Sequence, residues 1–446
     1  MESEVITRMK KGNKLFFTGM FGILFIMLAS AATAASDTQI LTLNECIELA
    51  LKQSPLIRSA EMDVEASRES LRGSKGALFP RIDLNAAYMK ENQPLPYIPA
   101  QSMKIPAKFS DEVYSWNIYL RMPVYEGGRL TKQVDVSELE KNIQASRTTF
   151  TAQDVVANVT NAFNKLLQLK ELRKANIKAV EAIERQRGNT ELLFKTGRAA
   201  NVELLRVNVQ LAGEQQNLIK TGEAMSRTKD LLAFFMGMDV HEISDISGTL
   251  SPEETIKEQD ASSLVKLRPD VIALSLKVEQ SGKRIGIAGA RRYPAIALVG
   301  NYGNRAGAEM HDREEVWEAG AVVSLNIFDA GIISSEVRRE QALQKKAEEE
   351  LRLAELKAKT EIENALSSFR EATQRLEVAE KALSQSEEAL RIEELKYKTG
   401  AGAITDVLLA QAAMSLAQAN YYQALYDRLS AVTEYKRATG TVEVKR

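Results

Sequence analysis

An internal repeat constrains this chain more than any other feature of its sequence. Residues 194–205 recur as residues 397–408, and both segments contain Lys-Thr-Gly. The same offset, about 203 positions, pairs residues 124–128 with residues 327–331 and residues 236–237 with 439–440. Similarity at a fixed period indicates one structural unit that occurs more than once. The sequence therefore predicts two copies of one design.

The copies have different lengths because the first contains an insertion. Residues 79–80 match residues 293–294 at an offset of about 214, larger than the offset further along. We expect the difference in a loop at residues 90–112, because prolines exclude a helix or a central strand there. These prolines are Pro94, Pro96, Pro99 and Pro106. The expected organisation is a first repeat at 36–237, an equatorial linker at 238–261, a second repeat at 262–440 and a tail at 441–446.

Each copy is expected to open with a helix. In the first copy this helix covers residues 43–75, and Thr42 with Glu45 forms a capping box at its start. The second copy opens near Ser263 and passes through Arg268-Pro269, as the first passes through Ser54-Pro55.

Two strands follow the opening helix in each copy. Residues 82–88 and 115–122 alternate between apolar and polar side chains, as do residues 295–302 and 317–328. Period-two runs of about ten residues suit strands that cross a membrane, although a soluble hairpin gives the same pattern. Aromatic side chains lie where membrane interfaces are expected. They are Tyr88, Tyr114, Trp116, Tyr302 and Trp317.

A very long helix comes next, followed by a glycine turn and a return helix. The long helices are expected at residues 131–195 and 334–398, about 100 Å each at 1.5 Å per residue. The second has a clear heptad seam of large side chains facing alanines, which predicts close helix packing. The seam of the first is weaker because Arg173 and Arg187 interrupt it. The second seam consists of Ile362, Phe369, Leu376, Leu383, Leu390 and Tyr397, facing Ala358, Ala365, Ala372 and Ala379.

The helix lengths indicate how each copy is arranged. The return helices are expected at residues 201–235 and 404–437, about thirty-five residues each. A return helix and an opening helix placed end to end are about as long as the one long helix. We therefore expect each copy to form two antiparallel helical columns, with its strand pair at one end.

The N-terminus resembles a secretory signal peptide at residues 1–35. Basic residues precede an apolar run, and Ala32-Thr33-Ala34 offers a cleavage site. An uncleaved signal anchor is the alternative.

No later stretch has eighteen consecutive apolar residues, which leaves a soluble periplasmic protein or strands inserted as a β-barrel. The net charge of −1 gives no electrostatic footprint for nucleic acid. Cys46 has no partner for a disulfide and its neighbours do not resemble a lipidation site.

Four membrane strands cannot close a barrel by themselves, because open sheet edges are unstable in lipid. Two chains would supply eight strands, three twelve and four sixteen. An eight-stranded barrel is filled by its own side chains, so a conduit requires three chains or more. Strand number alone does not decide between three chains and four.

Three segments in particular resemble the TolC-like outer membrane efflux protein family. They are residues 43–55, the Tyr-Glu-Gly-Gly junction at 125–128 and above all Gly-Ala-Gly-Ala-Ile-Thr-Asp-Val-Leu-Leu-Ala-Gln at 400–411. The resemblance covers residues 41–440 in both copies, in order. It implies a homotrimer with a twelve-stranded outer-membrane β-barrel and an α-barrel of twelve helical columns in the periplasm. It also implies a passive exit duct that meets a periplasmic adaptor, itself coupled to an inner-membrane pump.

The resemblance further implies roles at the turns far from the membrane. The tips would dock the adaptor through Gly197, Arg198, Ala199, Gly400, Ala401 and Gly402. Asp406, with Glu203 as its counterpart, would line the periplasmic gate, where three carboxylates would favour cations. Tyr397 matches a latch residue of relatives. Leu409 and Gly402 replace an acid and an arginine of those relatives, so Leu409 is expected to form an apolar ring.

The sequence offers few residues or motifs that could support enzyme chemistry, and no cofactor is expected. The two histidines, His241 and His311, lie in expected loops, and neither a Cys/His cluster nor a phosphate loop occurs. His311 with Glu309 and Asp312 is more simply an exposed loop than a metal site. The alternative functions are a periplasmic coiled-coil adaptor and a structural envelope protein. An adaptor should have one hairpin flanked by lipoyl-like halves, and a scaffold would not explain the paired strands.

Overall fold

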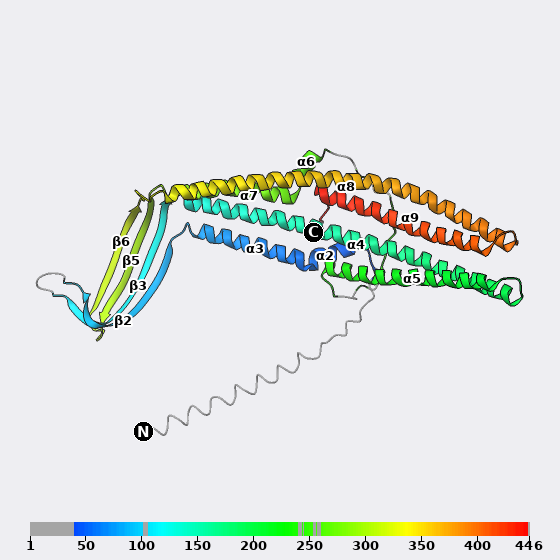
Figure 1. The fold of residues 1–446 in the computed structure, drawn as a ribbon. Helices are drawn as coiled ribbons and strands as arrows, with labels where there is room; N and C mark the ends of the chain where they lie inside the picture. The colour runs from blue at the N-terminus through cyan, green and yellow to red at the C-terminus, as the bar shows by residue number, and fades with distance from the viewer. Residues whose placement is uncertain are drawn as a thin grey trace, which may run out of the picture.

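The computed structural model describes residues 40–100, 106–239, 243, 245–252, 256 and 260–444. The expected signal peptide and His241 lie outside these residues. Figure 1 shows an elongated molecule, with long helices side by side and a four-stranded sheet at one end. The helices are α2 (Leu43–Gln53), α3 (Pro55–Gly76), α4 (Arg129–Lys195), α5 (Asn201–Met236), α6 (Ala261–Val265), α7 (Pro269–Ala290), α8 (Ile332–Lys398) and α9 (Ile404–Thr439).

The helix lengths repeat between the two halves of the chain. The opening helices α3 and α7 have 22 residues each, and the long helices α4 and α8 have 67 each. The return helices α5 and α9 have 36 residues each. The expected repeat is therefore confirmed for these three pairs of helices, which have equal lengths and no insertion, whereas α2 has 11 residues and α6 only 5.

The end-to-end arrangement of the short helices is also confirmed. Helices α3 and α5 both lie against α4, and α7 and α9 both lie against α8. The two copies join because α4 also contacts α7 and α9. One chain thus contributes four helical columns in the order α3/α5, α4, α7/α9, α8.

The first opening helix is divided in two, which corrects the expectation of one helix at residues 43–75. Helix α2 ends at Gln53 and α3 begins at Pro55, while Ser54 has φ −56° and ψ 122°. Proline disfavours a helical conformation in the preceding residue, so the chain bends there. The capping box of Thr42 and Glu45 is present as predicted. Its hydrogen bonds hold the pKa of Glu45 below the usual value.

The sheet contains β2 (Arg81–Ile98), β3 (Lys108–Glu126), β5 (Ala295–Gly307) and β6 (Arg313–Ser324), antiparallel and in that order. Its register follows the repeat, since Arg81 pairs with Arg121 and the equivalent Ala295 pairs with Ser324. Strands β2 and β6 form the edges, and their outer sides have no neighbour within the described part of the chain.

All four strands extend further toward their hairpin loops than the sequence predicts, and the fourth ends earlier. The irregular loop expected at residues 90–112 is largely strand: pairing of β2 with β3 continues to Ile98 and Lys108 across two register shifts. Strand β2 tolerates Pro94 and Pro96 because an edge strand need not donate every hydrogen bond. The fourth strand ends at Ser324 rather than at Phe328, because its partner β5 begins at Ala295.

The central part of the molecule holds the largest apolar core. It lies where α2, α4 and α5 meet, and a short parallel pair of β1 (Ile40–Leu41) and β4 (Asp245–Ile246) covers it. Its buried residues include Cys46, Phe163, Leu166, Leu232 and Met236. Burial raises the pKa of the Cys46 thiol to about 11, with a smaller contribution from Glu45. Within the described segments, no helix has both the length and the apolar character that crossing a membrane requires.

Candidate functional site at the hairpin tips

Both helix-to-helix turns lie at the end of the molecule farthest from the sheet (Figure 1). Gly197, between α4 and α5, has φ +73°, and Gly400, between α8 and α9, has φ +78°. Glycine adopts this left-handed conformation at little cost, which allows the last carbonyls of each long helix to be satisfied. The Arg198 amide donates to the Leu193 carbonyl at 2.8 Å, and the Ala401 amide donates to the Lys396 carbonyl at 2.9 Å.

The two turns share a backbone but present different side chains. Arg198 in the first turn corresponds to Ala401 in the second, and Ala199 corresponds to Gly402. A Cβ atom at Gly402 would lie 3.0 Å from the Lys396 Cβ, so a side chain at this position would be crowded. The first tip is therefore cationic and the second is small and uncharged.

A small apolar cluster holds the tips next to each other. Ile183 on α4, Val207 and Leu211 on α5, and Leu390 on α8 are buried together. Ile404 and Val407 complete it from α9, and Tyr397 packs against it while partly exposed. The two hairpins therefore end as one unit.

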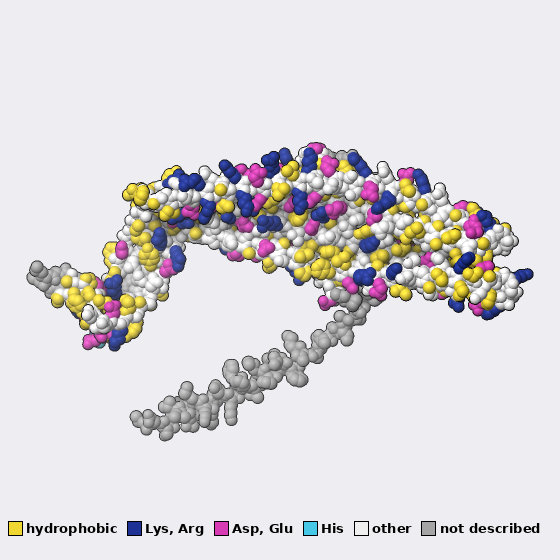
Figure 2. Space-filling view, in the orientation of Figure 1, with side chains coloured by type: hydrophobic (Ala, Val, Ile, Leu, Met, Phe, Trp, Pro, Cys, Tyr) yellow, Lys and Arg dark blue, Asp and Glu magenta, His cyan; other side chains and the backbone are white. Residues whose placement is uncertain are grey.

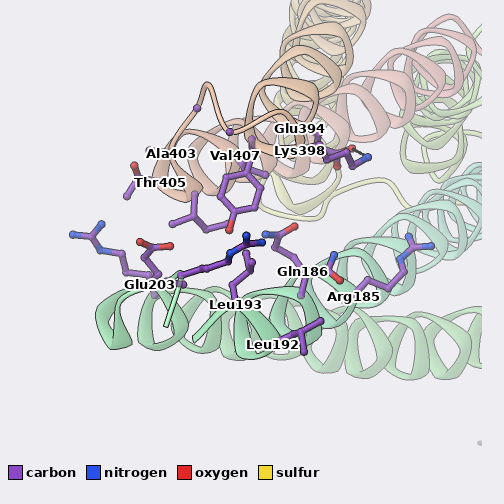
Figure 3. A pocket seen from close by; sticks show the side chains of 18 of the residues that line it. Arg185, Gln186, Leu192, Leu193, Glu203, Glu394, Lys398, Ala403, Thr405 and Val407 are labelled. Carbon is purple, nitrogen blue, oxygen red and sulfur yellow. Dashed lines mark ion pairs between the residues drawn. The ribbon is translucent and has the colours of Figure 1, made fainter. Parts of the chain in front are cut away.

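A groove of about 1090 Å³ runs between the tips and draws its lining from all four helices. Figure 3 shows Leu193 and Glu203 on the α4–α5 side. Across from them lie Ala403, the N-cap of α9, and Thr405 and Val407 of α9. The charged lining is mainly basic on the first hairpin and mixed on the second, where Lys398 pairs with Glu394 at 3.8 Å. The charged residues are Arg185, Arg198, Glu203, Arg206, Glu394 and Lys398.

A second hollow of about 450 Å³ lies between the first turns of α5 and α9 and is mostly apolar. Val202, Leu205 and Val209 line it from α5, and Leu408 and Leu409 from α9. Leu409 is 70% exposed and Val209 is 74% exposed in the single chain. Such a large exposed apolar patch is typical of an interaction or pore surface.

The structure divides the predicted gate residues among three surroundings. Tyr397 and Glu203 line the groove, and Leu409 lines the apolar hollow. Asp406 is exposed and lines neither. It precedes Leu409 by three residues on α9, so the two side chains share a helix face. Asp406 and Glu203, equivalent in the repeat, are therefore not equivalent in space.

Only some of the predicted tip residues line the groove. Arg198, Ala199, Gly400 and Gly402 line the groove, whereas Gly197 and Ala401 lie outside its lining. Sequence-based prediction missed Arg185, Gln186 and Arg206, which line the groove from within α4 and α5. It also missed the apolar hollow, although Val202, Leu205 and Val209 follow the i, i+3, i+7 spacing of a helix face.

His311 occupies an exposed loop between β5 and β6. Its Nδ1 lies 3.0 Å from the Glu309 carbonyl oxygen, and Asp312 pairs with Lys108. Within the residues described, no cluster of three or more His, Cys, Asp or Glu side chains is arranged to hold a metal ion.

Comparison with known proteins identifies the family. The sequence model of the outer membrane efflux protein family matches residues 46–237 and 261–441. The outer membrane protein TolC of Vibrio cholerae is 20% identical over 427 residues, covering 93% of this chain and 94% of that protein. OprJ of Pseudomonas aeruginosa is 24% identical over 418 residues, covering 89% of this chain and 84% of that protein.

A solved structure supports the same fold. VceC of Vibrio cholerae, an outer membrane protein, superposes with a TM-score of 0.76 and 20% identity, covering 89% of this chain and 96% of VceC. The long helices, the four-stranded sheet and the family match together give one answer: this chain belongs to the outer membrane efflux protein family.

Proposed function

We propose that this protein is one subunit of a trimeric exit duct in the outer membrane, which carries substrate passively from the periplasm to the exterior. The observation that carries this proposal is the separation of the two ends of the molecule. The sheet lies at one end and both hairpin tips lie at the other (Figure 1). Between them, 67-residue helices extend about 100 Å at 1.5 Å per residue.

The sheet supports the membrane part of the proposal. Its edge strands carry large exposed apolar side chains, among them Ile82, Leu84 and Trp317. Aromatic side chains meet across the strands, with Tyr88 and Tyr114 ring centroids 4.8 Å apart. Both edges offer unpaired backbone groups, which in lipid must find partners. Three chains would supply twelve strands, enough to close a barrel with an open lumen.

The tips support docking of a periplasmic adaptor that is coupled to an inner-membrane pump. Their groove is open, combines charge with apolar surface and is built from both copies of the repeat. A partner hairpin could therefore contact both tips of one subunit at once. Gly197, Arg198, Ala199, Gly400, Ala401 and Gly402 form the turns that it would meet.

The exposed face of α9 supports a gate. Asp406 and Leu409 lie on this face near the tip, and three-fold symmetry would bring three copies of each together. A ring of carboxylates favours cations, and a ring of leucines narrows the opening. Glu203 and Tyr397, inside the groove, would act on the gate through the packing of the hairpins. The chain needs no enzyme chemistry for this task, and cargo selection falls to the pump and adaptor.

The test is electron microscopy of the mature protein extracted from outer membranes in detergent, combined with conductance in planar bilayers. We expect three-fold hollow particles about 130–140 Å long, combining the helices with a barrel. We also expect single-channel currents. Protein that washes off without detergent, or a solid rod without conductance, would overturn the proposal in favour of an adaptor or a scaffold.

A further inference from the structure

One contact between the two copies of the repeat also predicts how adjacent subunits meet. Inside the chain, the long helix of the first copy, α4, lies against the opening helix of the second copy, α7. The equivalent helices, α8 and α3, occupy the two ends of the row of helical columns. Because α3 and α7 have equal lengths, as do α4 and α8, the residues of one contact map onto the other without gaps.

The contact inside the chain is polar and specific. Lys283 Nζ of α7 lies 3.1 Å from Asp135 Oδ2 of α4. One turn away, Gln280 Nε2 donates to Glu140 Oε2 at 2.8 Å and to the Val136 carbonyl at 3.1 Å. The first contact places an acid on the long helix opposite a base on the short helix.

The equivalent positions carry reversed charges. Arg338 of α8 corresponds to Asp135, and Glu69 of α3 corresponds to Lys283. Leu343 and Ala66 correspond to Glu140 and Gln280, so the neighbouring polar pair becomes an apolar one. All four side chains are exposed in the single chain, with Glu69 at 51% and Leu343 at 45%. Arg338 donates to the Ser335 hydroxyl at 3.1 Å, and Glu69 accepts from Arg72 at 2.8 Å, both within their own helices.

We propose that α8 of one subunit docks against α3 of a second copy of this chain, with Arg338 paired to Glu69 of that copy and Leu343 packed on its Ala66. This inference rests on the proposed trimeric duct and adds the residues and the register of its subunit contact. The occupant is a second copy because the chain already forms the same contact once within itself.

The reversed charges also determine which copies can be neighbours. The free ends of the row are α3 and α8. If the first repeats of two subunits met there, Glu69 would face Glu69, and if the second repeats met, Arg338 would face Arg338. Like charges at such contacts are unfavourable, and repulsion of wrong partners is a common source of specificity. The charge pattern therefore favours a ring in which first and second repeats alternate.

Next to the sheet, the proposed contact between subunits resembles the contact inside the chain less closely. A Cβ atom at Gly127 would lie 2.4 Å from the Ala290 carbonyl oxygen, so the contact inside the chain requires glycine there. The equivalent residue of the second copy is Ala330, at φ +52°, and it would face Gly76 of the adjacent subunit. The Ala330 methyl group requires a wider approach between subunits at this level than between repeats.

The first experiment is site-directed cross-linking in detergent with a short bis-maleimide. The double variant Leu343→Cys/Ala66→Cys should give covalent dimers and trimers on a denaturing gel, and each single variant should give monomers. Leu343→Cys/Arg68→Cys is the matched control, because residue 68 points about 200° around α3 from residue 66. Buried Cys46, whose pKa is about 11, should not react.

The second experiment exchanges the charges. Arg338→Glu and Glu69→Arg, each alone, should lower the trimer fraction at fixed dilution about threefold or more in low salt, because they create like-charge contacts. The double exchange should restore the trimer. Arg352→Glu, the same change at an exposed position of α8, should leave the trimer fraction unchanged. In 1 M salt the differences should largely disappear.

The two proposals can fail separately. A trimer that forms without the 343–66 cross-link, or singles that are not rescued by the double exchange, would overturn this contact and leave the duct intact. Absence of any oligomer in the unmodified protein would instead overturn the proposed duct.

Discussion

The two long helices, α4 and α8, have the same length and each begins after a glycine in the left-handed conformation, yet their surroundings differ. Helix α4 lies between α3 and α5 on one side and α7 and α9 on the other. Helix α8 contacts α7 and α9 but ends the row of columns. The consequence is 21 buried residues in α4 against 10 in α8, so one chain completes the packing of only one of its two copies.

The heptad patterns alone would indicate the opposite, namely that α8 is the more buried of the two long helices. The second copy has the stronger seam, and its alanines are buried as predicted, with Ala358 at 1% and Ala372 at 4% exposure. The first copy has the weaker seam but the larger core. A regular heptad indicates packing against one partner along a supercoil, whereas α4 buries several faces against several helices. Figure 2 shows apolar side chains over the sheet and on the lower flank of the bundle, and charged ones along α8.

The largest loss of stability is expected at the junctions where the chain bends immediately before α3 and α7. Arg268 is 4% exposed, lies 2.8 Å from Asp270 and 2.7 Å from Glu361, and donates to the Ala438 carbonyl. Burial alone would lower the pKa of Arg268, but its carboxylate hydrogen bonds hold that pKa above the usual value. Arg268→Ala should therefore lower the free energy of unfolding by about 3–5 kcal/mol.

The counterpart in the first copy provides the control for this prediction. Ser54 is buried, and its hydroxyl has no hydrogen-bond partner among the described residues. Ser54→Ala should be neutral or slightly stabilising, because no hydrogen bond is lost. Urea unfolding followed by circular dichroism would measure both variants. Equal losses at the two positions would show that the copies share one kind of junction.

The next largest loss of stability is expected to differ between the two long helices. Leu166 on α4 is fully buried in the central core, so Leu166→Ala should cost about 2–5 kcal/mol. Its counterpart Phe369 on α8 is only partly buried, with Arg428 over its ring at 5.6 Å. Phe369→Ala should cost less, about 1–2 kcal/mol, although it removes more atoms. Equal unfolding midpoints for the two variants would mean that assembly covers α8 as fully as α4.

The third prediction compares the changes in stability caused by substitutions at the two strand-to-helix junctions. Gly127→Ala combines a left-handed conformation with a clash against the Ala290 carbonyl, so it should cost at least about 1–2 kcal/mol. Ala330→Gly should instead stabilise the protein by up to about 1 kcal/mol, because Ala330 already holds a positive φ. Thermal unfolding of the pair would test the signs. A stabilising Gly127→Ala would contradict the close contact between α7 and this junction.

The smallest effect concerns the gate. Asp406→Asn should lower the cation-to-anion permeability ratio in planar bilayers about twofold, or roughly 0.4 kcal/mol, because in the proposed trimer it would remove a ring of three carboxylates. Glu203→Gln should change the ratio less, since Glu203 lines the groove between the tips. A larger change from Glu203→Gln than from Asp406→Asn would place the narrow point of the pore at the groove instead.

Much of the helical plan follows from the sequence because helix signals are local. The prediction of long helices at 131–195 and 334–398 is within two residues of α4 and α8 at every boundary. The glycine turns were equally clear, since Gly197 and Gly400 follow long stretches free of proline. Strand limits were less predictable, because Pro94 and Pro96 are compatible with a strand only if that strand lies at an edge.

The candidate site was predictable only in part. Tyr397, Glu203 and the tip residues were singled out from their place in the repeat, but Arg185 and Arg206 were not. These arginines lie within helices, and no local pattern marks them as facing the other hairpin. The sequence alone also treats Asp406 and Glu203 as equivalents, because an alignment of repeats compares positions along the chain and not their surroundings.

Local signals were enough to predict the two-copy plan, the helix lengths and the turn positions, because periodicity, capping and glycine act over a few residues. Packing between distant segments decided that α4 is enclosed and α8 is not, and that one groove unites both tips. It also decided that Asp135 meets Lys283 and that their charge-reversed counterparts remain exposed at the two ends of the row of helical columns. The physical reason is that burial and charge pairing depend on neighbours far apart in the sequence, and two nearly identical copies have different neighbours.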